Sequence, residues 1–229
     1  MLDVNKQKIM KAVLVFIAYF AYNMVVNCFC EVLGIKDPIM ISFIADILFS
    51  VVIVFFYRKE IYKSICDFRK DYSFKKRFVV VILGVLILFV LNILGGIVSE
   101  MLFSDLYDVD QNTTMIYELA NMSTIYTIFK TLIFASIVEN IVFRVSIREL
   151  VRNNFAFIIV SSLIYALVNV MYSDFTLLTI VDMVQYFLIS FTLSSIYVKY
   201  KDSIYPVMMI LFCYNMIPLA ILLFGIGAW

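Results

Sequence analysis

Histidine is absent from this sequence of 229 residues. It is the side chain best suited to proton transfer near neutral pH, and it is the commonest metal ligand in proteins. Cysteine is scarce, and the four cysteines lack the spacing of a metal site, so we interpret them as unpaired small hydrophobic residues: Cys28, Cys30, Cys66 and Cys213. The sequence therefore predicts neither a metal site nor a cofactor.

Charged residues are also scarce. They make up 15% of the chain against 64% hydrophobic residues, whereas a soluble domain has about 25% and about 45–50% respectively. One soluble core cannot hide this excess of apolar side chains, so lipid must cover much of it. The net charge of +1 gives no indication of a nucleic-acid partner. We therefore predict an all-α polytopic membrane helix bundle, because the bilayer offers no water to satisfy an open backbone.

Seven apolar stretches approach or exceed the length needed to cross the hydrocarbon region, which is about 20 residues. We expect a single membrane domain over residues 1–229, with an N-terminal three-span part (1–122) and a four-span core (123–229). The predicted spans are residues 9–32, 38–57, 78–103, 123–148, 155–172, 176–197 and 204 to the end.

Lysine and arginine set the predicted orientation, because short loops rich in these residues stay in the cytoplasm. Basic residues gather at the N-terminus, after the second span (58–77), after the fourth and after the sixth, whereas residues 104–122 contain none. We predict the N-terminus inside and the C-terminus outside. The abundance of Ile, Lys, Asn and Tyr is typical of a low-GC bacterium, so the predicted location is a bacterial cytoplasmic membrane.

Ionisable side chains at membrane depth are expensive, at least about 2.5–3.5 kcal/mol each on insertion scales, and they are usually functional. Outside the motif described next, the predicted intramembrane polar cluster comprises Asp46, Lys130, Asp182 and Gln185. Asp46 or Asp182 is the expected partner of Lys130. The amides Asn23, Asn27 and Asn92 are interpreted as hydrogen-bonding contacts between helices.

The fourth span contains "ENIVFR", which places Glu139, Asn140 and Arg144 within six residues of an apolar segment. This is more polarity than helix packing requires. Arg144 is the expected partner of Glu139, although five residues is not the ideal spacing for an α-helix. Glu139 and Asp182 alone do not provide the three protein ligands of a catalytic zinc site.

This motif resembles the first motif of the CAAX-protease and bacteriocin-processing family, also called the Abi or type II CAAX prenyl protease family. That motif is a pair of glutamates, three residues and an arginine. "YALVN" resembles the second motif, with Asn169 where the family has histidine. "SIYPVMMILFCYN" resembles the third, with Asn215 retained and Leu211, or Ile210 in a shifted register, in place of histidine. The resemblance covers residues 125–219.

The resemblance implies an intramembrane protease in which a glutamate and a histidine activate water while a second histidine and an asparagine assist. In this chain the first glutamate is Glu139, the second is replaced by Asn140, and both histidines are missing. Loss of one good acid–base partner costs about 10²–10⁴-fold in rate. The motif positions Glu139, Asn140, Arg144, Asn169 and Asn215 are therefore interpreted as the remnant of a catalytic site.

Three functions follow from this reading. The favoured one is a catalytically inactive family member, a pseudoenzyme that acts as a scaffold, a regulator or a bacteriocin-immunity-type factor. Its partners would be the lipid bilayer and another membrane protein or a membrane-associated peptide. A divergent glutamate-dependent intramembrane protease is the alternative. A small transporter or receptor is a further one, although six glycines and three prolines leave few of the broken helices that transporters often use.

The topology can be checked by cysteine labelling in intact cells, on a background without native cysteine. We expect an impermeant thiol reagent to reach Asp110→Cys and not Lys70→Cys, because the basic region 58–77 should be cytoplasmic. The reverse labelling pattern would overturn the orientation.

Overall fold

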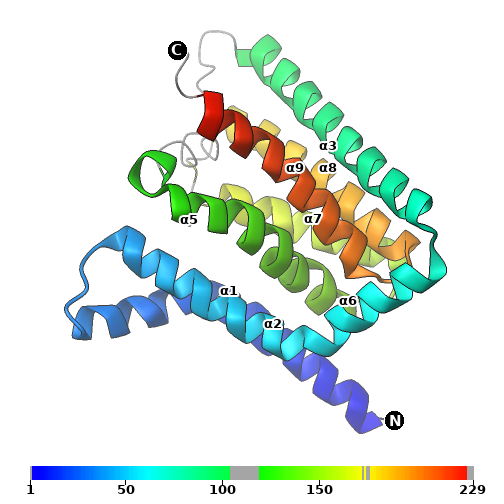
Figure 1. Ribbon diagram of the computed structural model, residues 1–229, viewed down its shortest axis with the longest axis horizontal. Helices are drawn as coiled ribbons and strands as arrows, with labels where there is room; N and C mark the ends of the chain where they lie inside the picture. The colour runs from blue at the N-terminus through cyan, green and yellow to red at the C-terminus, as the bar shows by residue number, and fades with distance from the viewer. Residues whose placement is uncertain (1, 104–118, 172, 174–175, 226–229) are drawn as a thin grey trace.

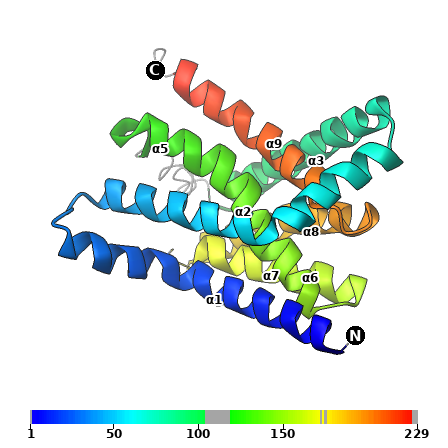
Figure 2. The same ribbon diagram turned by 60° about the horizontal axis from the view of Figure 1, so that its bottom comes forward.

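The computed structural model describes residues 2–103, 119–171, 173 and 176–225, and these residues form a bundle of helices (Figures 1 and 2). The all-α prediction is confirmed, since no strand occurs in this part of the chain. Outside the fourth predicted span, the helices are α1 (Leu2–Val32), α2 (Pro38–Asp71), α3 (Phe74–Phe103), α7 (Asn154–Val170), α8 (Leu177–Lys199) and α9 (Ile204–Gly225). The fourth span consists of α5 (Thr124–Ile128), η1 (Phe129–Glu139), η2 (Ile141–Ser146) and α6 (Ile147–Leu150).

Six of the described helical segments are long and apolar enough to cross a membrane. The predicted fifth span corresponds to α7, which has 17 residues and lies at the lower end of the range for spanning helices, about 17–25 residues. The predicted loop at 104–122 lies largely outside the described residues. Orientation relative to the cytoplasm stays a prediction.

The helix that contains the second predicted span extends beyond it. The prediction placed its end at residue 57, but α2 continues to Asp71 and only two residues separate it from α3. The physical reason is that Lys, Arg and Glu are good helix formers, so the charged stretch prolongs the helix beyond the hydrocarbon. The resulting helix of 34 residues is about 50 Å long. Its start is fixed by Asp37, whose carboxylate accepts a hydrogen bond from the Ile39 amide at 2.9 Å.

One hydrophobic core joins both halves of the chain. It includes Val15 of α1, Ile53 of α2 and Leu88 of α3 together with side chains of the fourth span and of α7, α8 and α9. Within it, α7 packs extensively against α8, and α1 packs against α2 and η2 (Figure 2). The predicted N-terminal part thus buries apolar surface against the predicted core.

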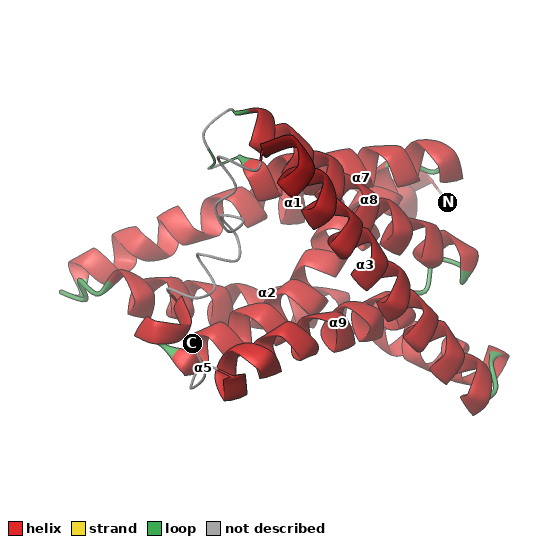
Figure 3. Cartoon of the chain, turned by 90° about the horizontal axis from the view of Figure 1, so that it is seen from above, coloured by secondary structure: helices red, strands yellow, loops and turns green. Residues whose placement is uncertain are grey.

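Helix α3 lies on the outside of the bundle against α8 and α9 (Figure 3). Asn92 bridges all three helices: its Oδ1 accepts from Gln185 Nε2 at 2.6 Å, and its Nδ2 donates to Tyr214 Oη at 2.8 Å. The expectation that Asn92 holds helices together is met. Gln185 therefore belongs to this α3–α8 contact.

Close approach of α3 to α9 depends on Gly84. A Cβ atom at this position would lie 2.7 Å from Ile210 Cγ1, and Ile210 is fully buried. We expect Gly84→Leu to destabilise the protein by about 1–3 kcal/mol, the usual range for an overpacked core. Thermal unfolding in detergent measures this change. Leu86→Ala, on the exposed face of α3, is the control and should unfold close to the wild type; equal losses in both variants would contradict the argument.

Candidate functional site

The backbone of the fourth span departs from an α-helix. Segments η1 and η2 are π-helical on both sides of Asn140. Such geometry, with hydrogen bonds from residue i to i+5, is rare, usually limited to one turn, and frequent at functional sites. It was not predicted, because the apolar pattern of a span carries no signal for the width of the helix. The first motif therefore lies on an unusually wide turn of backbone.

Side-chain donors supplement the backbone hydrogen bonds of this wide helix. Two of them come from the segment itself and two from the neighbouring helices α7 and α9. The bonds are Asn140 Nδ2 to the Ser136 carbonyl (2.7 Å), Ser146 Oγ to Ile141 (3.3 Å), Ser161 Oγ to Phe143 (2.6 Å) and Asn215 Nδ2 to Thr131 (2.9 Å). Two of these bonds also connect the segment to the neighbouring helices α7 and α9.

Glu139 is a half-buried residue at the end of η1. The charged groups that act on it are Lys130, Arg144 and Asp46. The expected direct ion pair with Arg144 is wrong: within the described residues no cation lies within 4 Å of this carboxylate. Glu139 is thus placed in a charged environment without being tied to one partner.

The Arg144 side chain is fully buried. One of its terminal nitrogens, Nη2, donates to Ser190 Oγ of α8 at 3.0 Å, and the guanidinium lies 4.9 Å from the centre of the Tyr165 ring of α7. Its Nε and Nη1 atoms, like Asn140 Oδ1 and Ser136 Oγ, have no hydrogen-bond partner among the described residues. Arg144 therefore links the motif to α7 and α8 through a hydroxyl and an aromatic face.

The other motif positions are occupied by groups with structural partners. Asn169 Nδ2 donates to the Tyr165 carbonyl of its own helix at 2.8 Å, and Asn215 donates to η1 as described above. Leu211 is 3% exposed and lies in the hydrophobic core. At all three asparagine positions, 140, 169 and 215, one N–H of the amide thus donates to a main-chain carbonyl.

A second polar centre surrounds Asp46, which is 1% exposed. Its Oδ1 accepts from Tyr22 Oη at 2.6 Å, and its Oδ2 accepts from Tyr126 Oη at 2.9 Å and from Lys130 Nζ at 2.8 Å. Lys130 therefore pairs with Asp46, one of the two expected partners, rather than with Asp182. We call these four residues the Asp46 node; it joins α1, α2 and the fourth span.

Sequence reasoning missed the tyrosines of this region. Tyr22 and Tyr126 belong to the node, and Tyr19 interacts electrostatically with Glu139 while its ring packs edge-on against Phe143, 5.1 Å between centroids. A signal was available, because a buried phenol usually needs a hydrogen-bond partner and several tyrosines occupy the predicted spans.

A metal site is not evident among the described residues, which contain no group of three or more His, Cys, Asp or Glu side chains able to hold an ion.

Part of the chain matches a known protein family. Residues 121–217 match the family described as type II CAAX prenyl endopeptidase Rce1-like. This confirms the resemblance seen in the motifs of the fourth span and of α7 and α9. Neither a curated protein nor a solved structure matches the chain.

Removing the charge of Asp46 should loosen the contact between the N-terminal helices and the motif helix. We expect Asp46→Asn to destabilise the protein by about 2 kcal/mol, below the ~3–5 kcal/mol of a fully buried pair because the Lys130 side chain is 35% exposed. Tyr22→Phe removes one hydrogen bond to the carboxylate and should cost about 1.5–3 kcal/mol. A double-mutant cycle with Lys130→Met measures the coupling; a coupling of zero would contradict the ion pair's role.

Proposed function

We propose that this integral membrane protein, whose residues 121–217 form an Rce1-like domain of the CAAX protease family, acts by binding rather than by cleaving. It would serve as a scaffold, a regulator or a bacteriocin-immunity-type factor in a bacterial cytoplasmic membrane. Its partner would be another membrane protein or a membrane-associated peptide. The proposal rests on the residues that occupy the motif positions around Glu139.

Those positions offer Glu139 no conventional partner for proton transfer. An asparagine amide does not take up and return a proton near neutral pH, and Leu211 has no polar side-chain atom. One N–H of each of the amides Asn140, Asn169 and Asn215 donates to a main-chain carbonyl. A developing oxyanion needs donors placed in advance, and each amide has only its second N–H left for that role.

The expected loss in reaction rate is large enough to favour a binding function over a catalytic one. General acid–base catalysis contributes about 10²–10⁴-fold for one well-placed group, and two motif histidines are missing here. The same polar residues are well explained as supports of the fold, since they satisfy carbonyls of η1 and α7. A family fold preserved without its acid–base groups can still present a surface to a peptide or a helix.

A divergent glutamate-dependent protease is the second candidate, and one observation favours it. Glu139 is not held in a direct ion pair, and its surroundings include the Lys130 ammonium and the Tyr19 hydroxyl. Such an enzyme would take its acid from these groups or from the Tyr165 hydroxyl, which also interacts electrostatically with Glu139. Against this, Lys130 is already bonded to Asp46 at 2.8 Å.

A cleavage assay separates the two candidates. We expect the purified protein in detergent to leave prenylated CAAX peptides and hydrophobic peptides intact, at the same background rate as Glu139→Ala. Mass spectrometry of the peptides detects cleavage. Cleavage by the unmodified protein that disappears in Glu139→Ala would refute the binding proposal and establish the protease.

Two further variants sharpen this test. The triple change Asn140→Glu, Asn169→His and Leu211→His restores the family residues, and any cleavage gained only there supports the loss of catalysis in the natural chain. Leu211→His alone should be destabilised by about 1–3 kcal/mol, because it buries a polar group among apolar neighbours. If the protein works without cleaving a substrate, expression of Glu139→Ala in cells that lack the protein should restore the lost phenotype as fully as the wild type does.

A further inference from the structure

A cavity of about 750 Å³ lies at one end of the bundle, apart from Glu139 and the Asp46 node. Its walls come from four regions of the chain: the start of α1, the charged end of α2, the segment around α6, and the turn between α8 and α9. These are the four basic regions that the charge pattern assigned to one side of the membrane. The fold therefore gathers them around one cavity, at the predicted cytoplasmic surface.

The inner part of the cavity is lined by buried side chains. Ser64 Oγ of α2 and Ser203 Oγ of the α8–α9 turn are hydrogen-bonded at 2.8 Å, and Ser64 Oγ also accepts from the Tyr205 amide at 3.0 Å. Phe68 and Tyr197, which are 2% and 3% exposed, complete this wall. The interior is thus a fixed surface of hydroxyls and aromatic rings, whereas charges line the rim.

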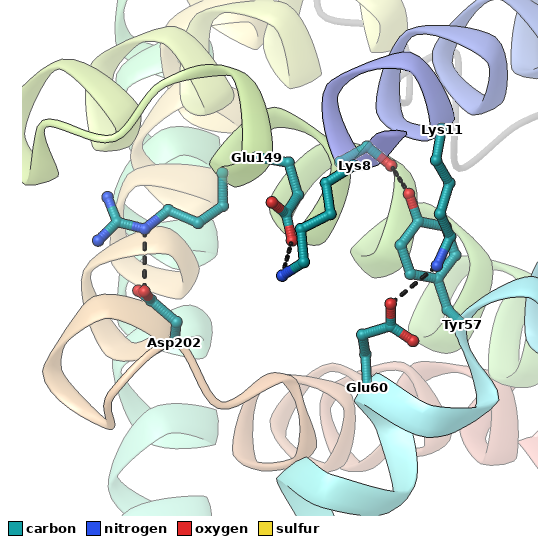
Figure 4. A network of polar contacts seen from close by, with 8 residues as sticks. Lys8, Lys11, Tyr57, Glu60, Glu149 and Asp202 are labelled. Carbon is teal, nitrogen blue, oxygen red and sulfur yellow. Dashed lines mark hydrogen bonds and ion pairs between the residues drawn. The ribbon is translucent and has the colours of Figure 1, made fainter. Parts of the chain in front are cut away.

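Most carboxylates of the rim are already neutralised by cations, as Figure 4 shows for three of the pairs. Four of the five have a partner. The ion pairs are Lys8–Glu149 at 3.4 Å, Lys11–Glu60 at 2.8 Å, Arg148–Asp202 at 3.0 Å and Lys201–Asp71 at 2.7 Å. Arg148 is further held by hydrogen bonds to the Arg152 carbonyl and to Asn154. These pairs form a frame and leave other cations available to a ligand.

Two lysines are not part of that frame. Lys63 and Lys70 line the cavity from α2, are exposed, and form no ion pair within the described residues. They are seven residues apart, so they lie two turns apart on the same face of the helix. Asp67 is the one lining carboxylate without an ion pair in the described structure. Asp67 lies four residues after Lys63 and three before Lys70, on the same face of α2, so these three residues contribute a net charge of +1.

The turn at the other side of the cavity is held in an uncommon backbone conformation. Lys201 and Asp202 have φ angles of 59° and 58°, in the left-handed region that residues other than glycine seldom occupy. Each side chain reaches a different helix, Asp71 of α2 and Arg148 of α6. The hydrogen bond to Asp71 raises the pKa of Lys201. The turn is thus fixed by two charge contacts across the cavity.

We propose that this cavity binds a phosphate group, with Lys63 and Lys70 as its principal charged donors. Compact ammonium groups suit phosphate, and basic pockets between membrane helices on the cytoplasmic side are typical sites for lipid head groups. Lys63 follows the predicted end of the second span by six residues, or about 9 Å of helix, which brings its flexible side chain near the head-group layer. The phosphate of an anionic phospholipid is therefore the source that the location favours, and free phosphate is the other source of the same chemistry.

Native mass spectrometry of the full chain tests the proposal, with phosphatidylglycerol, phosphatidylcholine and inorganic phosphate added separately to the detergent-solubilised protein. We expect phosphatidylglycerol to be retained over phosphatidylcholine. The double change Lys63→Gln and Lys70→Gln should weaken retention by roughly 25-fold, about fivefold for each lysine near a membrane surface. Both lysines are exposed, so the fold should survive, and thermal unfolding checks this.

The matched control removes two other exposed lysines of the same basic region, Lys59→Gln and Lys75→Gln, which do not line the cavity. It should retain phosphatidylglycerol as the wild type does. Equal weakening in the two double variants would mean diffuse surface attraction and would overturn the site, as would no preference for phosphatidylglycerol together with no binding of inorganic phosphate. Binding of inorganic phosphate alone, lost on changing Lys63 and Lys70, would confirm the site and assign it to the soluble ligand.

Discussion

The main-chain carbonyls of the motif helix impose the constraint on which much of this structure depends. A π-helical backbone inside a bilayer has no water to bond with, so any carbonyl group it leaves exposed must be met by the protein. Asparagine and serine side chains of the motif helix, α7 and α9 donate additional hydrogen bonds to four carbonyls of this segment. The same contacts position α7 and α9 against the fourth span. Residues that a family comparison would read as catalytic thereby acquire a structural explanation.

A charged hydrogen-bond network, in addition to apolar packing, connects the N-terminal helices to the fourth span. Asp46 receives hydrogen bonds from Tyr22, Tyr126 and Lys130, and so connects α1, α2 and the fourth span. A buried carboxylate with three donors is satisfied where an isolated one would be very costly. The apolar contacts of Val15 and Ile53 with the common core are non-directional. The hydrogen bonds of the Asp46 node are directional. They therefore fix the register of α1 and α2 against the motif helix.

Much of the fold follows from the sequence, since long apolar runs in a bilayer have few alternatives to a helix. The bounds of α8 and α9 lie close to those expected, and Asp46 was among the expected partners of Lys130. The extension of α2 past residue 57 was missed because hydropathy detects the lipid boundary, whereas helix propensity decides where the helix ends. The separation of Glu139 from Arg144 and the engagement of Tyr22 depend on helix width and on the packing of distant segments. A single sequence carries little information on either.

The uninterrupted length of α2 has a mechanical consequence. No glycine or proline occurs between residues 39 and 71, so the helix has no built-in hinge between the Asp46 node and the cavity that Lys63 and Lys70 line. Along α2, Asp46 and Glu60, the nearest residue that lines the cavity, are 14 residues apart, about 21 Å of helix. A tilt imposed on one end is therefore transmitted to the other. A movement at the charged surface can thus reach the interior of the bundle through α2 itself, without a series of side-chain movements in between.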